Sequence, residues 1–433
     1  MPYAWSRPTR PTRPSSYATA TCRFAAWWRP LCASTIKAFS VYLHLPYCRR
    51  KCPYCDFNTY AVATVPESDY CAALMREMSW WADQPQWQGR GVDSVFFGGG
   101  TPSLFGPTAI GSLLEHLDKL FGLDDGAEVT LEANPGSLEG GGLERLQGFH
   151  EAGVNRLSLG GQSFNDRHLK TLGRLHNAAD TRAALAAARK AGFDDLSCDL
   201  IFAVPEQTVA EWRSDLECLV DVGVDHVSAY NLTYEQGTPM TAMVADGRLE
   251  AAGNDREADM YDLAIDLLGQ SGYGQYEISN FARPGHRSRH NLAYWSWRDY
   301  LGLGAGAHGF WRQTAGDGAV GDGATAGHRY KDLRLPALYM AAKDGGWTEE
   351  SESLSRDQGS SEFIMLALRL SDGLEEAEFA RTFGVELATA APSLGQMCSG
   401  GLVERRGGRV RLTRRGLMLA DSVIPQLAVG AGA

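Results

Sequence analysis

Three cysteines carry the clearest chemical signal in the chain. Cys48, Cys52 and Cys55 lie in the segment Tyr-Cys-Arg-Arg-Lys-Cys-Pro-Tyr-Cys, a Cx3Cx2C spacing directly after a short apolar run. Three thiolates leave one iron of a four-iron cluster free for a small molecule, whereas a structural zinc ion needs a fourth protein ligand. We therefore predict a [4Fe-4S] cluster. A zinc site completed by His44 or a distant residue, and three buried thiols without a metal, are the alternatives.

Two further motifs follow the cysteines along the chain. An apolar run ends in Gly99, Gly100 and Thr101, and Glu132 lies in Leu-Glu-Ala-Asn-Pro. Together with the cysteines, these motifs resemble the radical S-adenosylmethionine (SAM) superfamily. The resemblance implies that SAM binds at the open iron, with the two glycines and Thr101 near its amino group and Glu132 near its ribose. A strand-ending turn and a helix cap are the plainer explanations of the glycines and the carboxylate.

Composition limits the class of protein. The chain has 433 residues, of which 44% are hydrophobic, so it can form one large domain and a smaller one. It has no run of 18 apolar residues that would span a membrane, although peripheral membrane association stays open. The net charge of −11 argues against nucleic acid as the main partner. Six cysteines outside the motif have no regular spacing, which indicates reduced thiols and a cytoplasmic protein.

The first 38 residues differ from the rest of the chain. They contain six basic residues and no Asp or Glu, and they are rich in Ser, Thr and Pro. We predict a disordered extension or a leader that does not belong to the fold. An organelle transit peptide has a similar composition, so a mitochondrial location is the alternative to the cytoplasm.

From residue 39 the chain alternates apolar strands with helical segments. The predicted strands are 39–46, 93–99, 128–134, 156–162, 196–204 and 226–233. Gly153, Gly192 and Gly223 take the left-handed position that ends a helix before the next strand. Six βα units predict an α/β fold with a parallel sheet, and the family resemblance implies a partial (β/α)6 barrel over 39–311. The candidate site residues then lie at carboxyl ends of strands, where barrels build their active sites.

The remainder of the chain has a different pattern. Residues 312–353 read as a loop and linker, with a Gly-rich flexible stretch at 312–328. Residues 354–425 predict a small winged-helix-like α+β domain, with helices near 362–370 and 379–387 and a hairpin turning at Gly407 and Gly408. Its arginines favour a solvated face over a DNA-binding surface, because no recognition helix is basic.

A narrower resemblance covers residues 39–425. The opening Tyr-Leu-His-Leu-Pro-Tyr-Cys and the C-terminal segment resemble the oxygen-independent coproporphyrinogen III dehydrogenases and their relatives, the HemW-type haem chaperones. The resemblance implies that Tyr42 and Glu132 contact the cluster-bound nucleoside. It implies that Gln162, Arg174 and Asp199 line a second nucleoside pocket.

Two features separate these relatives. The dehydrogenases carry a further cysteine two residues after the third cluster ligand, where this chain has Phe57. The chaperones carry an HNxxYW motif, which occurs here within the region 273–311 and implies haem binding by His290, Asn291, Tyr294 and Trp295. His308, in a glycine-rich loop, is an equal candidate for the axial ligand, because neutral imidazole commonly ligates haem iron.

Our first hypothesis is therefore a haem chaperone, with haem, a haem-accepting apoprotein and an electron donor as partners. The second is radical decarboxylation of coproporphyrinogen III, and the third is radical chemistry on an unrelated substrate.

The chain departs from these relatives after Asp199. It reads Asp-Leu-Ile-Phe-Ala-Val-Pro-Glu-Gln, with Ala203 and Glu206 where the relatives usually have glycine. If these positions need a positive φ, the backbone is strained there.

Overall fold

The computed structural model describes residues 38–138, 142–313 and 325–428. The predicted leader at 1–38 lies almost wholly outside the described residues. No helix in the described segments is long and apolar enough to cross a membrane.

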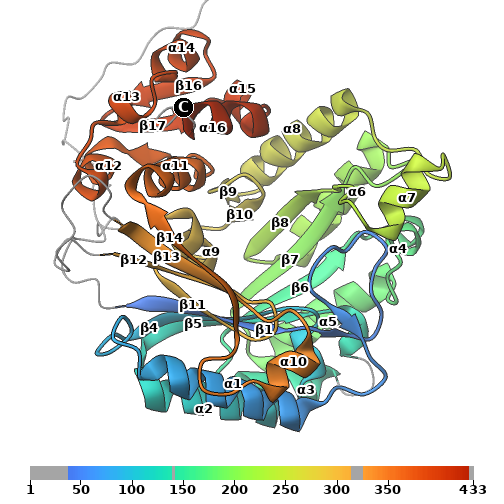
Figure 1. Ribbon diagram of the computed structural model, residues 1–433. Helices are drawn as coiled ribbons and strands as arrows, with labels where there is room; N and C mark the ends of the chain where they lie inside the picture. The colour runs from blue at the N-terminus through green and yellow to red at the C-terminus, as the bar shows by residue number, and fades with distance from the viewer. Residues whose placement is uncertain (1–37, 139–141, 314–324, 429–433) are drawn as a thin grey trace, which may run out of the picture. The chain divides into compact units, whose positions relative to one another are not determined.

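The six predicted strands form one parallel sheet in chain order (Figure 1). Each strand pairs with the next in parallel register, as expected for successive βα units. The strands are β1 (Phe39–Leu45), β4 (Val92–Gly99), β5 (Leu123–Ala133), β6 (Arg156–Gln162), β7 (Asp195–Phe202) and β8 (His226–Asn231). The predicted α/β fold with an open partial barrel is confirmed.

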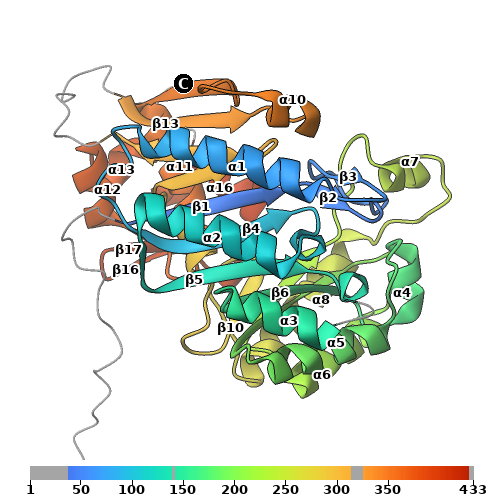
Figure 2. The same ribbon diagram turned by 90° about the horizontal axis from the view of Figure 1, so that it is seen from below.

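One helix of ten residues or more follows each of these strands. These helices are α1 (Glu67–Ala82), α2 (Pro107–Phe121), α3 (Gly142–Glu151), α5 (Ala178–Ala191), α6 (Val209–Val222) and α8 (Asn254–Gln270). Both views show α1 and α2 side by side (Figures 1 and 2), and the apolar face of α2 is buried. Gly153, Gly192 and Gly223 have φ of 104°, 105° and 74°, which confirms the predicted helix ends. Short helices α4 (Asp166–Thr171) and α7 (Pro239–Ala245) precede α5 and α8.

The sheet extends beyond the six predicted strands. β11 (Tyr300–Leu303) pairs in parallel with β1, so a strand from the predicted haem-motif region adds a seventh parallel member. Antiparallel strands then continue the sheet at both edges: β12 (His308–Arg312), β13 (Thr325–Asp332) and β14 (Thr348–Ser355) beyond β11, and β10 (Asn280–Ala282) and β9 (Gly274–Gln275) beyond β8.

The region predicted as loop and linker is more ordered than expected. Residues 325–332 and 348–355 form β13 and β14, and α10 (Pro336–Ala341) lies between them. These strands have few apolar residues, and β14 is exposed along most of its length, so their sequence gives little hydrophobic signal. Their pairing, which joins residues more than fifteen positions apart, decides the structure. The rest of the predicted loop, 314–324, lies outside the described residues.

The C-terminal region combines helices with a three-stranded sheet. The predicted hairpin is present, with β16 (Val403–Arg406) and β17 (Arg409–Leu412) joined at Gly407 and Gly408, and β15 (Leu374–Glu375) pairs with β17. The helices are α11 (Arg356–Ala367), α12 (Glu376–Phe383), α13 (Leu387–Ala390), α14 (Leu394–Ser399), α15 (Arg414–Leu417) and α16 (Ala420–Ala428). The single helix expected at 379–387 is divided, because Gly384 ends α12 in the left-handed conformation.

The two substitutions noted after Asp199 fall on strained backbone. Ala203 has φ of 60° and Glu206 has φ of 63°. A left-handed residue with a Cβ costs roughly 1–2 kcal/mol relative to glycine's freedom there. The turn after β7 therefore keeps the conformation that glycine favours, although alanine and glutamate occupy these two positions.

Candidate functional site

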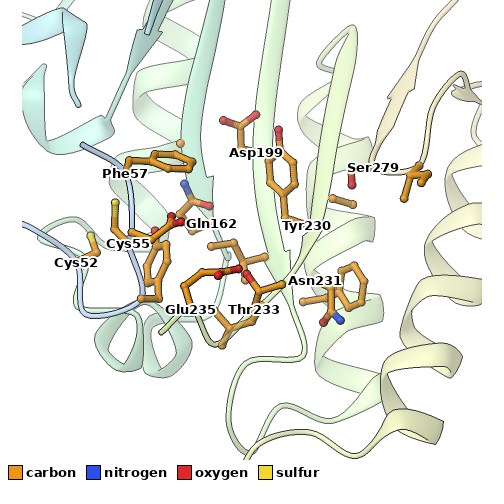
Figure 3. A pocket seen from close by; sticks show the side chains of 18 of the residues that line it. Cys52, Cys55, Phe57, Gln162, Asp199, Tyr230, Asn231, Thr233, Glu235 and Ser279 are labelled. Atoms are coloured by element: carbon orange, nitrogen blue, oxygen red, sulfur yellow. The ribbon is translucent and has the colours of Figure 1, made fainter. Parts of the chain in front are cut away.

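The carboxyl ends of the barrel strands open into a cavity of about 960 Å³, which we call the mouth cavity (Figure 3). The cysteine loop forms one wall, and the ends of β5 to β8 form its floor. Helix α8 and the segment 417–422, which includes the ends of α15 and α16, form the opposite wall. Residues from nearly the whole length of the described chain thus meet in one site.

The cysteine loop presents its three sulfurs to the mouth cavity. β2 (Tyr47–Cys48) pairs with β3 (Tyr60–Ala61), which closes the loop, and the Cys55 N–H donates to the Cys52 carbonyl at 3.2 Å. Each sulfur also has a polar side chain within 4 Å: Thr101 Oγ1 at 3.6 Å from Cys48, Arg174 Nη1 at 3.6 Å from Cys52, and Thr59 Oγ1 at 4.0 Å from Cys55. Such donors stabilise thiolate sulfur.

The spacing of the sulfurs distinguishes between the metals considered. Among the described residues, one group brings three potential ligand atoms within 4.8 Å of one another, and it consists of Asp195, Asp225 and His286. The sulfurs of Cys48, Cys52 and Cys55 do not all lie within this distance of one another, whereas the ligands of a single ion would. A four-iron cluster distributes its thiolates over separate irons, so the cysteines fit a cluster better than zinc.

His44 is not free to complete a zinc site. Its Nδ1 lies 2.9 Å from the Tyr42 hydroxyl, and its Nε2 lies 2.9 Å from the Asn58 carbonyl. Both ring nitrogens are therefore engaged, and burial lowers the pKa of the imidazole. His44 is a neutral residue that holds the base of the cysteine loop.

The glycines after β4 pack against that loop. Gly99 has φ of 109°, and a Cβ there would collide with the His44 ring. A Cβ on Gly100 would lie 2.6 Å from the Tyr47 carbonyl oxygen. The absence of side chains thus lets β4 approach the cysteine loop and leaves both residues lining the mouth cavity.

Two carboxyl groups lie at the floor of the mouth cavity. Glu132 Oε2 accepts from the Gly99 N–H at 3.1 Å, and burial beside Asp199 raises the pKa of Glu132 to about 8. Asp199 accepts from Ser158 Oγ at 3.3 Å, and burial raises its pKa as well. Glu132 is therefore largely protonated at neutral pH, and it offers both a donor and an acceptor to a ligand.

The residues predicted for a second nucleoside pocket, Gln162, Arg174 and Asp199, all line the mouth cavity. Gln162 lines the mouth cavity with φ of 65°. Arg174 also lines it, but its guanidinium turns to the cysteine loop, where it donates to Cys52 Sγ and, at 3.0 Å, to the Gly160 carbonyl. Arg174 thus contacts a predicted cluster ligand directly.

Tyr42 lies behind the floor rather than in the mouth cavity. It lines an inner chamber of about 170 Å³ inside the barrel, together with residues from β5 to β8 and from α9 (Arg289–Trp295). Glu132, Ser158, Asp199 and Tyr230 line both cavities. Contact between Tyr42 and a bound nucleoside stays a prediction.

Helix α9 carries the HNxxYW motif into the barrel. Glu128 of β5 accepts from the N–H groups of Arg289 and His290 at 2.8 and 3.0 Å, and Ser288 caps the helix by accepting from the Asn291 N–H. A carboxylate at a helix N-terminus is stabilising. His290 is only 1% exposed, and with Asn291 and Tyr294 it lines the inner chamber.

Both nitrogens of His290 have partners in the interior. Ser94 Oγ donates to Ser40 and therefore accepts from His290 Nδ1 at 3.1 Å, while His290 Nε2 accepts from the Tyr294 hydroxyl at 2.8 Å. Phe96 stacks on the imidazole at 5.1 Å, and burial lowers the pKa of His290 to about 3. The lone pair that would bind iron is occupied by a hydrogen bond.

The other haem candidates lie apart from His290. Trp295 packs under the Arg369 guanidinium, 4.7 Å from its ring centre. His308 is exposed at the start of β12, opposite Lys331. It lines neither the mouth cavity nor the inner chamber, so the structure does not bring His308 and His290 into one site.

Comparisons with known proteins agree with these features. The radical SAM superfamily model matches residues 42–219, and the HemN C-terminal domain model matches residues 354–419. Heme chaperone HemW of Haemophilus influenzae is 37% identical over 78% of this chain and 85% of its own length. Heme chaperone HemW of Escherichia coli is 33% identical over 89% of this chain and 97% of its own length.

The chain belongs to the HemW family. A mitochondrial radical SAM domain-containing protein of Danio rerio is also similar, at 37% identity over 90% of this chain and 86% of that protein. The solved coproporphyrinogen III oxidase (HemN) of Escherichia coli, at 23% identity, covers 91% of this chain and 90% of its own with a TM-score of 0.74, which shows the same fold. As a radical SAM family, the HemW family implies a [4Fe-4S] cluster and SAM, and the cysteine loop fits the cluster.

Sequence reasoning missed the opposite wall of the mouth cavity. Tyr230, Tyr261 and Arg369 line it together with the segment 417–422. The apolar run Leu417-Met418-Leu419 was a signal, because the loop between two short helices had no evident reason to be apolar. Its location across from the cysteines needed the tertiary structure.

Proposed function

We propose that this protein is a haem chaperone, which binds haem and transfers it to an acceptor apoprotein. Its HemW relatives match most of the chain. Phe57 is the residue that favours a chaperone over an enzyme of radical decarboxylation. Its side chain is 63% exposed and lines the mouth cavity at the position where the dehydrogenases have a further cysteine. A phenyl ring offers an apolar face to a tetrapyrrole and no thiol chemistry.

We further propose which residues hold the resident cofactors. Cys48, Cys52 and Cys55 would ligate the [4Fe-4S] cluster, and SAM would meet its open iron from the mouth cavity. Gly99, Gly100, Thr101, Glu132, Gln162 and Asp199 all line that cavity within reach of a ligand placed there. When bound and reduced, the cluster supplies single electrons to the sulfonium. The chain itself contributes a neutral Glu132 and the backbone of the two glycines.

The partners and the compartment follow from this function. Haem, an acceptor apoprotein and an electron donor are the proposed partners. The cytoplasm is the proposed location, and a mitochondrial location, which the name of the Danio rerio relative carries, would require residues 1–38 to act as a transit peptide.

Haem titration of anaerobically reconstituted protein tests the proposal. We expect a Soret band that saturates at one haem per chain, and transfer of that haem to a separated apo-acceptor such as apomyoglobin. The matched assay supplies coproporphyrinogen III, SAM and a reductant to the same preparation. Formation of protoporphyrinogen, or the absence of any saturable haem binding, would overturn the proposal.

A further inference from the structure

The mouth cavity has a part that the proposed cluster and SAM residues do not use. Its far wall, as we call it, consists of residues from β8, α8, the turn between β9 and β10, and the C-terminal domain: Tyr230, Ala258, Tyr261, Ile278, Arg369, Met418 and Leu419. In Figure 3 the cysteines and Gln162 lie to one side, while Tyr230, Asn231 and Ser279 lie across the cavity from them. The far wall therefore offers a surface to a second ligand.

Exposed apolar side chains gather around this cavity. Among the described residues, eight large hydrophobic side chains are exposed, and Phe57, Tyr230 and Leu419 line the mouth cavity with 63%, 42% and 45% of their surface exposed. Exposed apolar surface that gathers in one place marks a binding site. The three residues come from the cysteine loop, from β8 and from the link between α15 and α16. Because they lie on different walls of one cavity, they can contact a broad, flat, apolar ligand at several places.

Cationic side chains lie at opposite sides of the same cavity. Arg50 and Lys51 line it beside the cysteines, and Arg369 lines it at the far wall. Arg369 Nε is buried and has no hydrogen-bond partner, while the guanidinium rests on the Trp295 ring. Guanidinium groups bind carboxylates well. The far wall thus offers the Arg369 guanidinium to an acidic group on an apolar ligand.

The inner chamber behind His290 is a poorer site for haem. Its volume of about 170 Å³ is below the roughly 300–1,000 Å³ of cavities that hold drug-sized ligands, and the mouth cavity lies at the upper end of that range. Haem bound to His290 would also have to break the hydrogen bond from Tyr294.

We propose that haem binds in the mouth cavity, with its apolar faces between Phe57, Tyr230 and Leu419 and a propionate on Arg369. This inference rests on the proposed chaperone function and assigns the place of its cargo. The HNxxYW motif then acts indirectly, because Trp295 is a positioning residue for Arg369. His290 keeps α9 in place inside the barrel.

The far wall also offers a ligand to the iron. Met418 lines the cavity with a thioether, which ligates haem iron without losing a proton. Tyr230 and Tyr261 are phenols that keep their protons at neutral pH, so they are poor ligands for the iron. Met418 is thus the side chain of the far wall that we assign to the iron.

Haem titration of paired variants tests this place. Ala258→Trp adds an indole within the cavity, and its control Asp259→Trp adds the same group at the adjacent, exposed position of α8. Leu419→Glu places a charge on the far wall, and its control Leu338→Glu changes an exposed leucine of α10. We expect the Kd for haem to rise about tenfold or more for the two cavity variants, a loss of about 1.4 kcal/mol, and to stay unchanged for the controls.

Variants of His290 in the HNxxYW motif and of Met418, the assigned iron ligand, test the inference against haem binding at His290. We expect His290→Gln, with iron content equal to wild type, to bind haem as wild type does, and Met418→Leu to shift the Soret maximum. Loss of haem in His290→Gln together with normal binding by Ala258→Trp and Leu419→Glu would overturn the inference. Absence of haem binding by the wild-type protein would instead overturn the proposed function itself.

Discussion

At the scale of single residues, Arg174 makes a contact that the family resemblance did not indicate. Arg174 lines the mouth cavity as a predicted nucleoside-pocket residue, and its guanidinium also donates to Cys52 Sγ and to the Gly160 carbonyl. Hydrogen bonds and positive charge next to a cluster sulfur favour the reduced, more negative cluster. Arg174 is therefore suited to tune the reduction potential of the cluster.

We predict that Arg174→Gln lowers this potential. The expected shift is on the order of 50 mV, the equivalent of about 1 kcal/mol of charge-assisted hydrogen bonding. Redox titration followed by EPR measures it. Arg182→Gln is the matched control, because Arg182 donates to Cys218 Sγ at 3.0 Å on the outer surface. An unchanged potential in Arg174→Gln with intact iron content would contradict this role.

At the scale of elements, α9 places His290 of the HNxxYW motif in the interior of the barrel. Glu128 fixes its first turn, and the helix then directs His290 inward onto Phe96. Burial lowers the pKa of His290 to about 3, from 6.5 for a free imidazole. Between these values the unfolded chain binds a proton that the folded chain does not. Stability therefore falls as the pH drops from 6.5 towards 3.

We predict that His290→Gln makes the protein less sensitive to acid. The loss of unfolding free energy between pH 6.5 and pH 4 should become shallower by up to about 1.4 kcal/mol per pH unit, because one proton-binding difference is removed. Denaturation midpoints of cluster-free protein, measured across this range, give the slope. His150→Gln, at an exposed position of α3, should keep the wild-type slope. Equal slopes for all three proteins would refute the buried neutral histidine.

At the scale of the described molecule, the C-terminal domain completes the mouth cavity rather than standing apart. Trp297 and Phe310 from the sheet side pack in one core with Phe363 and Phe383 of the C-terminal helices. Arg414 then attaches α15 to α8, since it donates to Asp262 at 2.6 Å and to Asp266 at 3.0 Å. The wall that we assign to haem therefore depends on contacts between two domains.

We predict that Arg414→Gln loosens this wall. Exposed ion pairs contribute about 1 kcal/mol or less, so the fold should persist while hydrogen exchange of residues 414–428 becomes faster. Mass spectrometry of exchanged peptides measures this locally. Arg411→Gln is the control, because its partner Glu404 lies in the same hairpin. Equal exchange in Arg414→Gln and wild type would show that the shared apolar core alone holds α15.

Local sequence was sufficient to predict the cysteine loop and the order of the six barrel strands. Cys48, Cys52 and Cys55 are close along the chain, so their chemistry is visible without a fold. The six strands follow from apolar runs separated by helices that end at glycines such as Gly192, because period and turn chemistry act over a few residues. The small C-terminal domain with its hairpin was also predictable for this reason.

Tertiary structure decided which of the candidate residues meet. Arg174 reaches Cys52 from 122 positions away, and Leu419 and Phe57 line one cavity whose walls come from both ends of the described chain. β13 and β14 became strands through their pairing, although neither has a strong apolar pattern. Nothing in the motif around His290 indicates that its ring turns inward, since burial depends on how α9 packs against β4 and β5. Such contacts join distant segments, and their energies depend on the packing of the folded chain rather than on neighbours in sequence.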